Sequence, residues 1–231
     1  MRFSAAALLR NTRQLFQHWP CTCFLCGAPA APGSTLCLWC RQALPQDPDT
    51  HPQTPHSALP APGPDELIAA FAYQYPVNRL IRHLKYSAGL ALVPLLADAL
   101  VQAIHRRQQA PDFPQRLIAV PLSRQRQRQR GYNQAWEIAR HLSRVLAIPL
   151  GSELVRVRHT PAQAGLNALQ RQRNLTQAFA LRAPVQGLDV ALIDDVYTTG
   201  STLAALTQLL RQQGARRVRA WVLARTPAPD F

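Results

Sequence analysis

Residues 190–202 read VALIDDVYTTGST and contain the clearest change of residue type in the chain. Its apolar half is followed by two adjacent acids, Asp194 and Asp195, and then by hydroxyl side chains gathered around Gly200. The whole chain has only 12 Asp and Glu against 26 Lys and Arg, so a neighbouring pair of acids is unexpected. Two carboxylates this close repel each other by about 3 kcal/mol at an effective dielectric constant of roughly 20. Some other interaction has to offset that cost.

The order of apolar run, acidic pair and hydroxyl-rich turn predicts a buried strand over 190–194, a loop, and a helix over 201–213. Neighbouring side chains of a strand point to opposite faces. Both acids can therefore face one ligand only where the strand has ended and the chain turns. In open α/β sheets, ligands bind at this carboxyl end of the strands.

The loop over 197–202 has the features of a phosphate site. It offers backbone N–H groups at the start of a helix, several hydroxyls, and a glycine that permits conformations closed to other residues. Carboxylates accept hydrogen bonds from a vicinal diol, or hold Mg²⁺ through its waters. A ribose 5-phosphate would satisfy both halves of the stretch. The simpler alternative is a strand–turn–helix capped by Ser201, which leaves the paired acids unexplained.

Composition places the chain among globular proteins with an anionic partner. At 231 residues, 47% of them hydrophobic, it is long enough for one full core and a small extra module. The formal charge of +14 favours nucleic acid or phosphate-rich small molecules, although a solvated basic surface would give the same charge. No apolar run reaches the ~20 residues of a membrane span. An amphipathic N-terminal helix and a cytoplasmic location are expected.

The chain divides by composition into three parts. Residues 1–44 hold an N-terminal helix and all five cysteines, and residues 45–64 carry seven prolines in twenty positions, which predicts a semi-extended linker. Residues 65–231 alternate between strand and helix patterns. Strands are expected at 67–73, 116–122, 190–194 and 218–224, and helices at 77–84, 90–107, 133–146, 166–177 and 201–213. This alternation predicts an α/β domain with a mostly parallel, doubly wound sheet.

Four cysteines are spaced as Cys23-x2-Cys26-x10-Cys37-x2-Cys40. Two CxxC pairs at this separation suit a tetrahedral Zn²⁺ site with four thiolate ligands, and disulfides are a poor alternative in a reducing cytoplasm. A segment of about 20 residues buries too little surface to fold alone, so the metal would supply the folding free energy and be structural. Cys21 is left over and is interpreted as a spare thiol.

The stretch 190–202 resembles the phosphoribosyl-pyrophosphate (PRPP) motif of type I phosphoribosyltransferases, in which an apolar strand precedes two acids and a T-G-[ST] loop. The resemblance implies that Asp194 and Asp195 bind the ribose hydroxyls, with Mg²⁺ bound together with PRPP. It also implies a 5-phosphate site formed by Thr198, Thr199, Gly200, Ser201 and Thr202.

A second resemblance covers nearly the whole chain. The four-cysteine module, LKYSAG (84–89), VPLSRQRQRQRGYNQA (120–135) and the PRPP motif together resemble the ComF family, and RVRHTPAQAGLNALQRQRNLTQAF (156–179) is similar to its pattern as well. That family is associated with natural competence and the use of external DNA. The resemblance implies a zinc ribbon followed by a phosphoribosyltransferase-like domain.

Several residues outside the PRPP motif have two interpretations. In type I transferases the loop after the second core strand binds pyrophosphate, and Ser123, Arg124 and the residues up to Arg130 take that place here, with Gly131 letting the backbone come close. The same arginines would otherwise form a solvated loop or contact nucleic acid nonspecifically. Lys85 either stabilises the C-terminus of its helix or contacts pyrophosphate.

Further polar residues near these segments are weighed in the same way. Tyr132 either stacks on a base or packs, and Asn133 is expected to cap the following helix rather than bind a ligand. Trp136 and the apolar residues after it are expected in the core. Arg156 and Arg158 match the mobile hood that type I transferases close over their substrate.

Two functions follow. One is an enzyme that transfers ribose 5-phosphate from PRPP to a nucleobase and releases pyrophosphate, by positioning and charge stabilisation with Mg²⁺. No general base or nucleobase pocket can be assigned from the sequence, so its catalytic residues stay unknown. The other is a competence factor that binds PRPP as a signal, or keeps the site without turnover, with single-stranded DNA and DNA-uptake proteins as partners. The ComF resemblance, the charge and the cysteine module favour the second.

Overall fold

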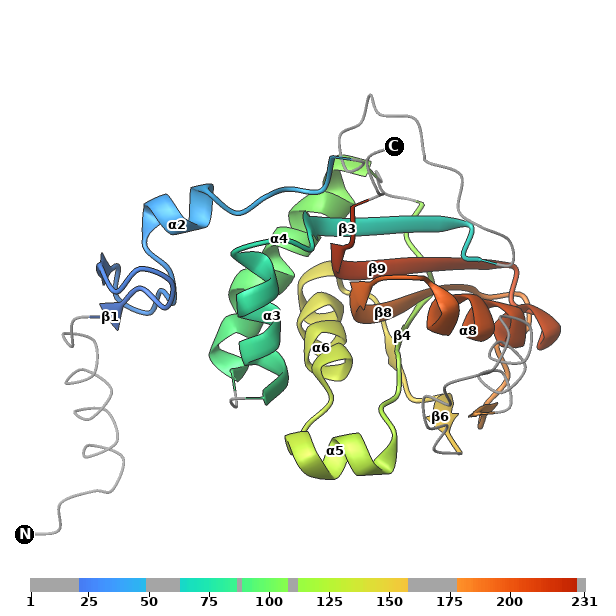
Figure 1. The fold of residues 1–231 in the computed structure, drawn as a ribbon. Coiled ribbons are helices and arrows are strands. Elements are labelled where there is room, and N and C mark those ends of the chain that lie inside the picture. Colours follow the sequence, from blue (N-terminus) through green and yellow to red (C-terminus); the bar gives the residue numbers. More distant parts are fainter. Residues whose placement is uncertain (1–20, 49–62, 87–88, 108–111, 158–177, 228–231) are drawn as a thin grey trace, which may run out of the picture. The chain divides into compact units, whose positions relative to one another are not determined.

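The computed structural model describes residues 21–48, 63–86, 89–107, 112–157 and 178–227. The chain divides into two compact units, residues 1–44 and 45–231, which are treated separately below (Figure 1). The N-terminal amphipathic helix and the helix expected at 166–177 lie outside the described residues. Among the described helices, none has both the length and the apolar character needed to cross a membrane.

The first unit is built around its cysteines. β1 (Cys21–Thr22) and β2 (Pro29–Ala30) form a short antiparallel pair, and α2 (Leu38–Gln42) follows them. Leu36 is buried together with Cys23 and Cys37. A unit with so little apolar surface to bury needs another source of stability, such as a bound metal.

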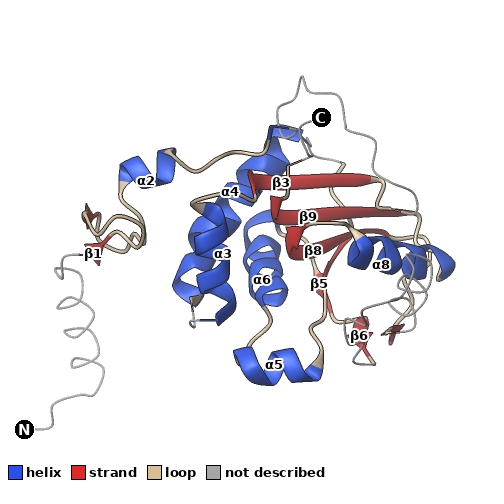
Figure 2. Cartoon of the chain, viewed as in Figure 1, coloured by secondary structure: helices blue, strands red, loops and turns tan. Residues whose placement is uncertain are grey.

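The second unit contains a five-stranded parallel sheet in the order β3-β9-β8-β4-β5 (Figure 2). Its strands are β3 (Glu66–Ala72), β4 (Arg116–Ala119), β5 (Leu150–Gly151), β8 (Asp189–Tyr197) and β9 (Arg217–Arg225). The central residues of β3, β8 and β9 are almost completely buried, as expected for a sheet covered on both faces. The predicted α/β fold with a parallel sheet is confirmed.

Helices cover both faces of the sheet. The described helices of this unit are α3 (Val77–Tyr86), the 3-10 turn η2 (Leu90–Leu92), α4 (Val93–Arg107), α5 (Arg124–Arg130), α6 (Gln134–Leu146) and α8 (Ser201–Gln212). The β4–α6–β5 crossover runs toward one edge of the sheet and the β8–α8–β9 crossover toward the other. Because such crossovers are right-handed, α6 and α8 lie on opposite faces. A doubly wound sheet is the result.

β8 is longer than the sequence predicts. The strand was expected to end at Asp194, whereas it continues to Tyr197 and keeps its parallel register with β9 as far as the pair Tyr197↔Arg225. β9 is equally long, so it offers backbone partners to the last residues of β8. The acidic pair therefore lies near the end of a strand, and the expectation of a turn at the acids is wrong.

The arginine-rich segment after β4 is a helix rather than the predicted loop. β4 ends at Ala119, and Ser123 caps α5 by accepting a hydrogen bond from the Arg126 N–H at 3.3 Å. Gly131 ends α5 in the left-handed conformation, with φ of 79°. A Cβ at Gly131 would meet no protein atom within 4 Å, so within the described residues it is the backbone conformation that favours glycine here.

Two smaller features border the sheet. β6 (Leu154–Arg156) and β7 (Phe179–Leu181) form an antiparallel pair. Residues 45–48, at the start of the proline-rich segment, run along β3: Gln46 bridges Phe71 in the antiparallel sense, and the Asp47 carboxylate lies 2.9 Å from the Arg225 guanidinium. These four residues are therefore attached to the second unit.

Candidate functional site

The candidate site lies at the carboxyl ends of β4 and β8. These strands are neighbours, but the chain leaves β4 toward α6 on one face and β8 toward α8 on the other. Ligands of open parallel sheets bind at such a topological switch point. Asp194 and Asp195 lie at this end of β8, and α5 follows the same end of β4.

The two acids have different surroundings. The Asp195 carboxylate is buried and lies 3.1 Å from the Lys85 ammonium group, while Asp194 Oδ1 accepts a hydrogen bond from the Asp195 N–H at 2.8 Å. Burial, followed by the charge of Asp195, raises the pKa of Asp194 to about 7, although Lys85 and Arg130 oppose this. At neutral pH one acid is thus paired and the other is partly protonated. The ion pair of Asp195 and the partial protonation of Asp194 together reduce the repulsion between the two acids.

Lys85 lies in the last turn of α3, where the sequence predicts it, but its ammonium group contacts β8. Its side chain is only 21% exposed. The ion pair with Asp195 belongs to neither of the two predicted roles of Lys85. No local pattern could have indicated it, because the partners belong to elements far apart in the sequence.

Side chains of the segment RGYNQA (130–135) hold the end of α3. The Tyr132 hydroxyl donates a hydrogen bond to the Leu84 carbonyl, and Gln134 Nε2 donates one to the Lys85 carbonyl at 3.5 Å. The last carbonyls of a helix lack partners within the helix, so these contacts satisfy groups that would otherwise need water. Tyr132 therefore packs against α3. Gln134 was missed by sequence reasoning, and only its place within RGYNQA could have indicated it.

Asn133 is the N-cap of α6, as predicted. Its Oδ1 accepts a hydrogen bond from the Ala135 N–H at 3.1 Å, and its Nδ2 donates to the Val120 carbonyl at 3.0 Å. The same side chain thus starts α6 and ties it to the chain just beyond β4. Trp136 differs from its prediction as a core residue, because it is 37% exposed, while Ile138 and Ala139 are buried.

Arg130 is the arginine of α5 that reaches this site. Its guanidinium donates a hydrogen bond to Gln134 Oε1 at 3.0 Å, lies 3.5 Å from the Tyr86 hydroxyl, and stands over the Tyr86 ring at 5.0 Å from the centroid. Its positive charge also counteracts the rise in the pKa of Asp194. Lys85 and Arg130 thus provide two cations beside the acidic pair.

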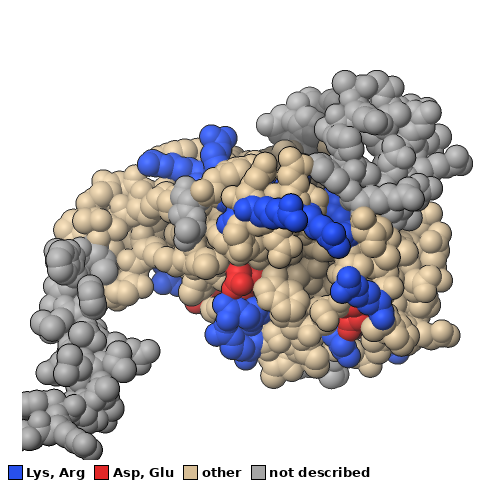
Figure 3. Space-filling model, turned by 90° about the horizontal axis from the view of Figure 1, so that it is seen from below, with Lys and Arg blue, Asp and Glu red and all other residues tan. Residues whose placement is uncertain are grey.

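The remaining arginines of α5 are exposed. Arg124, Arg126 and Arg128 lie at alternate positions of α5 and all three are exposed. Lys and Arg side chains also gather on the face drawn in Figure 3. Burial, and then the charge of Arg126, lower the pKa of Arg156 on β6, which indicates that Arg156 lies near α5. We call Arg124, Arg126, Arg128 and Arg156 the α5 face. Arg158 lies outside the described residues.

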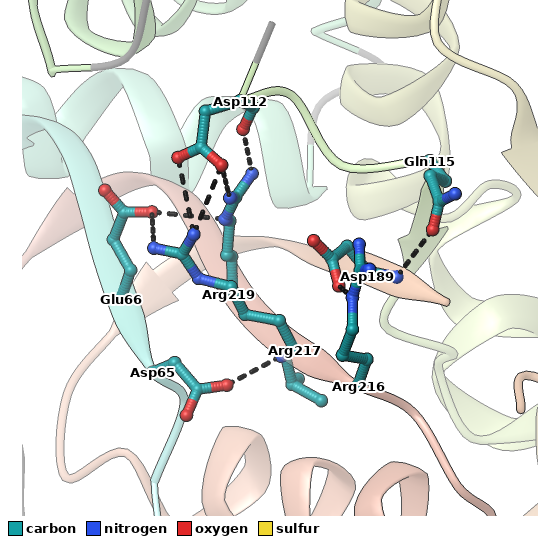
Figure 4. Close-up of polar contacts among 9 residues, drawn as sticks. Asp65, Glu66, Asp112, Gln115, Asp189, Arg216, Arg217 and Arg219 are labelled. Atoms are coloured by element: carbon teal, nitrogen blue, oxygen red, sulfur yellow. Dashed lines mark hydrogen bonds and ion pairs between the residues drawn. The ribbon is translucent and has the colours of Figure 1, made fainter. Parts of the chain in front are cut away.

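Arginines at the amino ends of the strands are paired with acids (Figure 4). Arg219 is completely buried, with Glu66 Oε2 at 3.4 Å from its Nε and Asp112 Oδ1 at 2.9 Å from its Nη2. Arg216 lies 2.7 Å from Asp189. Removing one partner of a buried pair leaves an uncompensated charge, so these contacts are structural. Their positive charge is neutralised locally by these acids.

The loop after β8 is shaped by Gly200. This residue is the N-cap of α8 in the left-handed conformation, with φ of 72°, and an added Cβ would lie 2.5 Å from the Tyr197 hydroxyl oxygen. Glycine is thus required by both conformation and space. α8 has no side-chain cap, so the alternative in which Ser201 merely caps the helix is wrong.

Polar groups of this loop face solvent. Thr198, Thr199 and Ser201 are exposed, and the Thr199 and Ser201 hydroxyl oxygens are 2.9 Å apart. The first intrahelical hydrogen bond runs from the Ala204 N–H to the Gly200 carbonyl at 2.8 Å. The N–H groups before Ala204 therefore have no acceptor within the helix and suit an anion.

The four cysteines of the first unit form the second candidate site. The sulfur atoms of Cys23, Cys26, Cys37 and Cys40 all lie within 4.8 Å of one another, and Cys26 Sγ is 3.7 Å from Cys37 Sγ. A tetrahedral ion with Zn–S bonds of about 2.3 Å requires S–S distances of about 3.8 Å. Burial raises the pKa of Cys23, but backbone N–H groups of Cys37, Cys26 and Leu25 outweigh it and lower that pKa to about 6. The cluster fits a structural zinc ion.

Comparison with known proteins places the whole chain. The DNA utilization protein YhgH of Shigella flexneri is 39% identical over 222 residues, which are 90% of this chain and 98% of that protein. Competence protein F of Haemophilus influenzae is 39% identical over 170 residues, or 71% and 74% of the two chains. The chain belongs to the ComF family. The predicted membership is confirmed.

The ComF chain also carries a recognised domain. The family model described as phosphoribosyl transferase domain matches residues 133–230. Among solved structures, one titled as the allosteric regulatory enzyme of purine biosynthesis is 18% identical, covers 62% of this chain and 30% of that chain, and has a TM-score of 0.44.

Three segments of the ComF resemblance meet at one place. LKYSAG supplies Lys85 and Tyr86, RGYNQA supplies Arg130 and the side chains that hold α3, and the PRPP motif supplies the acids. Each segment alone has a structural explanation. Their convergence at the carboxyl ends of neighbouring strands is what identifies a candidate binding site.

Proposed function

We propose that this ComF protein binds PRPP, or another ribose 5-phosphate ligand, together with Mg²⁺, and acts in the cytoplasm in the use of external DNA. One observation carries the proposal. Two adjacent acids near the carboxyl end of β8 and the left-handed Gly200 at the start of α8 lie at the switch point of the sheet, with the cations Lys85 and Arg130 beside the acids. The names of the relatives support the second half of the proposal.

Each part of the ligand has a matching part of the protein. Asp194 and Asp195 would accept hydrogen bonds from the ribose hydroxyls near the end of β8, where a sugar lying across the strand can meet side chains from both of its faces. The loop from Thr198 to Thr202 would hold the 5-phosphate. The pyrophosphate would meet Arg130 and Lys85, with Ser123 and Arg124 at the start of α5 as the outer part of that subsite. Each charge-assisted hydrogen bond would contribute ~1.5–3 kcal/mol. Mg²⁺ would neutralise the pyrophosphate and contact the acids through its waters.

Ligand-dependent stability tests the binding half. A ligand that binds only the folded state at 100 times its Kd stabilises that state by about 2.7 kcal/mol. Thermal unfolding with Mg²⁺ and PRPP should therefore show a higher Tm than with Mg²⁺ and inorganic pyrophosphate, which lacks the ribose and the 5-phosphate. Equal Tm values in the two mixtures, across a concentration series of both, would count against a PRPP site.

A structural zinc ion held by Cys23, Cys26, Cys37 and Cys40 belongs to the same proposal. Metal analysis should give about one zinc per chain, and Cys37→Ala should lose it because one of four ligands is removed. Cys21→Ala is the matched control and should keep the metal, since Cys21 is the spare thiol. Zinc that is absent from the unsubstituted protein under reducing conditions would refute the site.

Turnover is the second candidate function. The match to a phosphoribosyl transferase domain and the intact acidic pair favour an Mg²⁺-dependent enzyme of nucleobase salvage, which would release pyrophosphate as a base attacks ribose C1. We assign no general base among the described residues. Pyrophosphate release from PRPP, measured with and without each common nucleobase, distinguishes this enzyme from a protein that only binds.

A further inference from the structure

We propose that Lys85 is a specificity-determining residue that exchanges its partner, from Asp195 in the free protein to an anionic group at ribose C1 of the ligand. The inference rests on the proposed function, because it assumes that the acidic pair holds the ribose. It adds a reason for the site to favour PRPP over ligands that carry only a 5-phosphate.

Lys85 is paired with the carboxylate that the ribose would need. Its Nζ lies 3.1 Å from Asp195 Oδ2, and the side chains are only 21% and 13% exposed. Little solvent reaches the pair, so a sugar hydroxyl or a hydrated cation at that oxygen would compete with the ammonium group. The free protein therefore contains a built-in competitor for the ligand.

The side chain of Lys85 can change its partner although the end of α3 is fixed. Leu84 is completely buried, and the carbonyls of Leu84 and Lys85 are bound by Tyr132 and Gln134. The backbone at the end of α3 is thus fixed from two sides. A lysine side chain has a flexible four-carbon stem, so its ammonium group can move while α3 stays in place.

The displaced ammonium group of Lys85 needs a new anionic partner. A pentose with its 5-phosphate at the loop around Gly200 and its hydroxyls on the acids directs C1 away from that loop. Lys85 and Arg130, which both act on the charge of Asp194, are the cations next to the acids. A pyrophosphate at C1 would give Lys85 a new partner, whereas ribose 5-phosphate breaks the ion pair and supplies none.

The test compares two ligands and four proteins. Affinities for Mg²⁺–PRPP and for ribose 5-phosphate are measured by calorimetry on the full chain and on Lys85→Met, Lys85→Arg and Arg106→Met. Arg106 is an exposed basic residue in the last turn of α4, which leads to the start of β4, at the amino ends of the strands. It controls for the loss of one positive charge.

Lys85→Met should bind PRPP about tenfold more weakly, because one charge-assisted contact is lost. The same variant should bind ribose 5-phosphate several-fold more tightly, since no ion pair has to be broken. The preference for PRPP therefore falls through opposite changes in the two affinities. Lys85→Arg should keep most of the preference, and Arg106→Met should leave both affinities unchanged.

Other outcomes overturn the exchange. If Lys85→Met weakens both ligands equally, Lys85 is a simple attractive charge, and if it strengthens both, Lys85 is only a competitor. If neither affinity changes, its role is confined to the end of α3. These results leave the proposed function standing, whereas failure of the unsubstituted protein to bind either ligand overturns both. Thermal unfolding of each variant separates these effects from loss of folding.

Discussion

Asp194, which we propose binds the ribose, lowers the stability of the free protein when it is ionised. Its carboxyl is buried next to a second acid, and its pKa rises from 3.8 to about 7. The unfolded chain ionises this group near its ordinary value, so the raised pKa favours folding at low pH relative to high pH. That stability is fully present below pH 3.8 and is lost as the pH rises through about 7. A conflict of this kind is typical of functional sites.

Asp194→Asn should therefore stabilise the free protein, because asparagine needs no proton to stay neutral. The gain in the free energy of unfolding should be small near pH 4 and reach on the order of 2 kcal/mol at pH 8. Urea denaturation at both pH values measures it. A gain that does not depend on pH would show that Asp194 is ionised in the folded protein throughout this range.

Gly200 lies in a position that only glycine fits without strain. Gly200→Ala should destabilise the protein by roughly 2–4 kcal/mol, because the left-handed conformation and the contact with Tyr197 both oppose a side chain. Gly187→Ala is a matched control, since Gly187 has a similar φ of 71° with open space around its Cβ position. It should cost only about 1 kcal/mol. Equal losses in the two variants would mean that the Tyr197 contact is irrelevant.

Among the secondary-structure elements, the end of α3 depends on α6 and the turn before it. The hydroxyl of Tyr132 and the amide of Gln134 hold carbonyls that the helix cannot satisfy, and this fixes the point from which Lys85 reaches Asp195. The segment RGYNQA thus supports the site mainly by positioning α3. Only Arg130 of this segment has its charge beside the acids.

Tyr132→Phe removes one hydrogen bond and leaves the ring. The expected loss of stability is about 1 kcal/mol, and PRPP should bind more weakly because Lys85 is held less firmly. Tyr75→Phe is the control, since Tyr75 is 68% exposed and should tolerate the change. Urea denaturation and calorimetry read the two effects. An unchanged PRPP affinity in a destabilised Tyr132→Phe protein would separate the anchoring of α3 from binding.

Elements with local signals could be predicted from the sequence, and contacts between distant elements could not. The stripe of α3, the cap at Asn133 and the acids followed by Gly200 are all visible within a few residues. The helix α5 was missed because seven alternating Arg and Gln residues have no apolar periodicity. The pairs Lys85–Asp195 and Tyr132–Leu84 depend on the sheet order, which no single segment contains.

Across the whole second unit, positive charge is divided between two ends of the sheet. At the amino ends of the strands, arginines such as Arg216 and Arg219 are paired with Asp189, Glu66 and Asp112 (Figure 4). On the α5 face, positive side chains are exposed on the surface. The exposed arginines of α5 present positive charge on that side of the unit, and we expect a polyanion such as single-stranded DNA to bind there.

Replacing arginines at each end tests this division. Filter binding of single-stranded DNA should weaken steeply with salt, and the double change Arg126→Gln and Arg128→Gln should reduce the slope of log K against log salt by about 1.4, at about 0.7 per phosphate contact. The control double change Arg211→Gln and Arg216→Gln removes the same charge from paired positions and should change the slope little. Equal reductions in both proteins would mean that net charge alone drives retention.

Calorimetry of Mg²⁺–PRPP binding at pH 8 tests whether Asp194 and Asp195 hold the ribose. Asp194→Asn and Asp195→Asn should each weaken binding at least tenfold, because each carboxylate supplies charge-assisted hydrogen bonds. Asp189→Asn, at the other end of β8, should bind as the unsubstituted protein does. Full affinity in both of the first two variants would contradict the account.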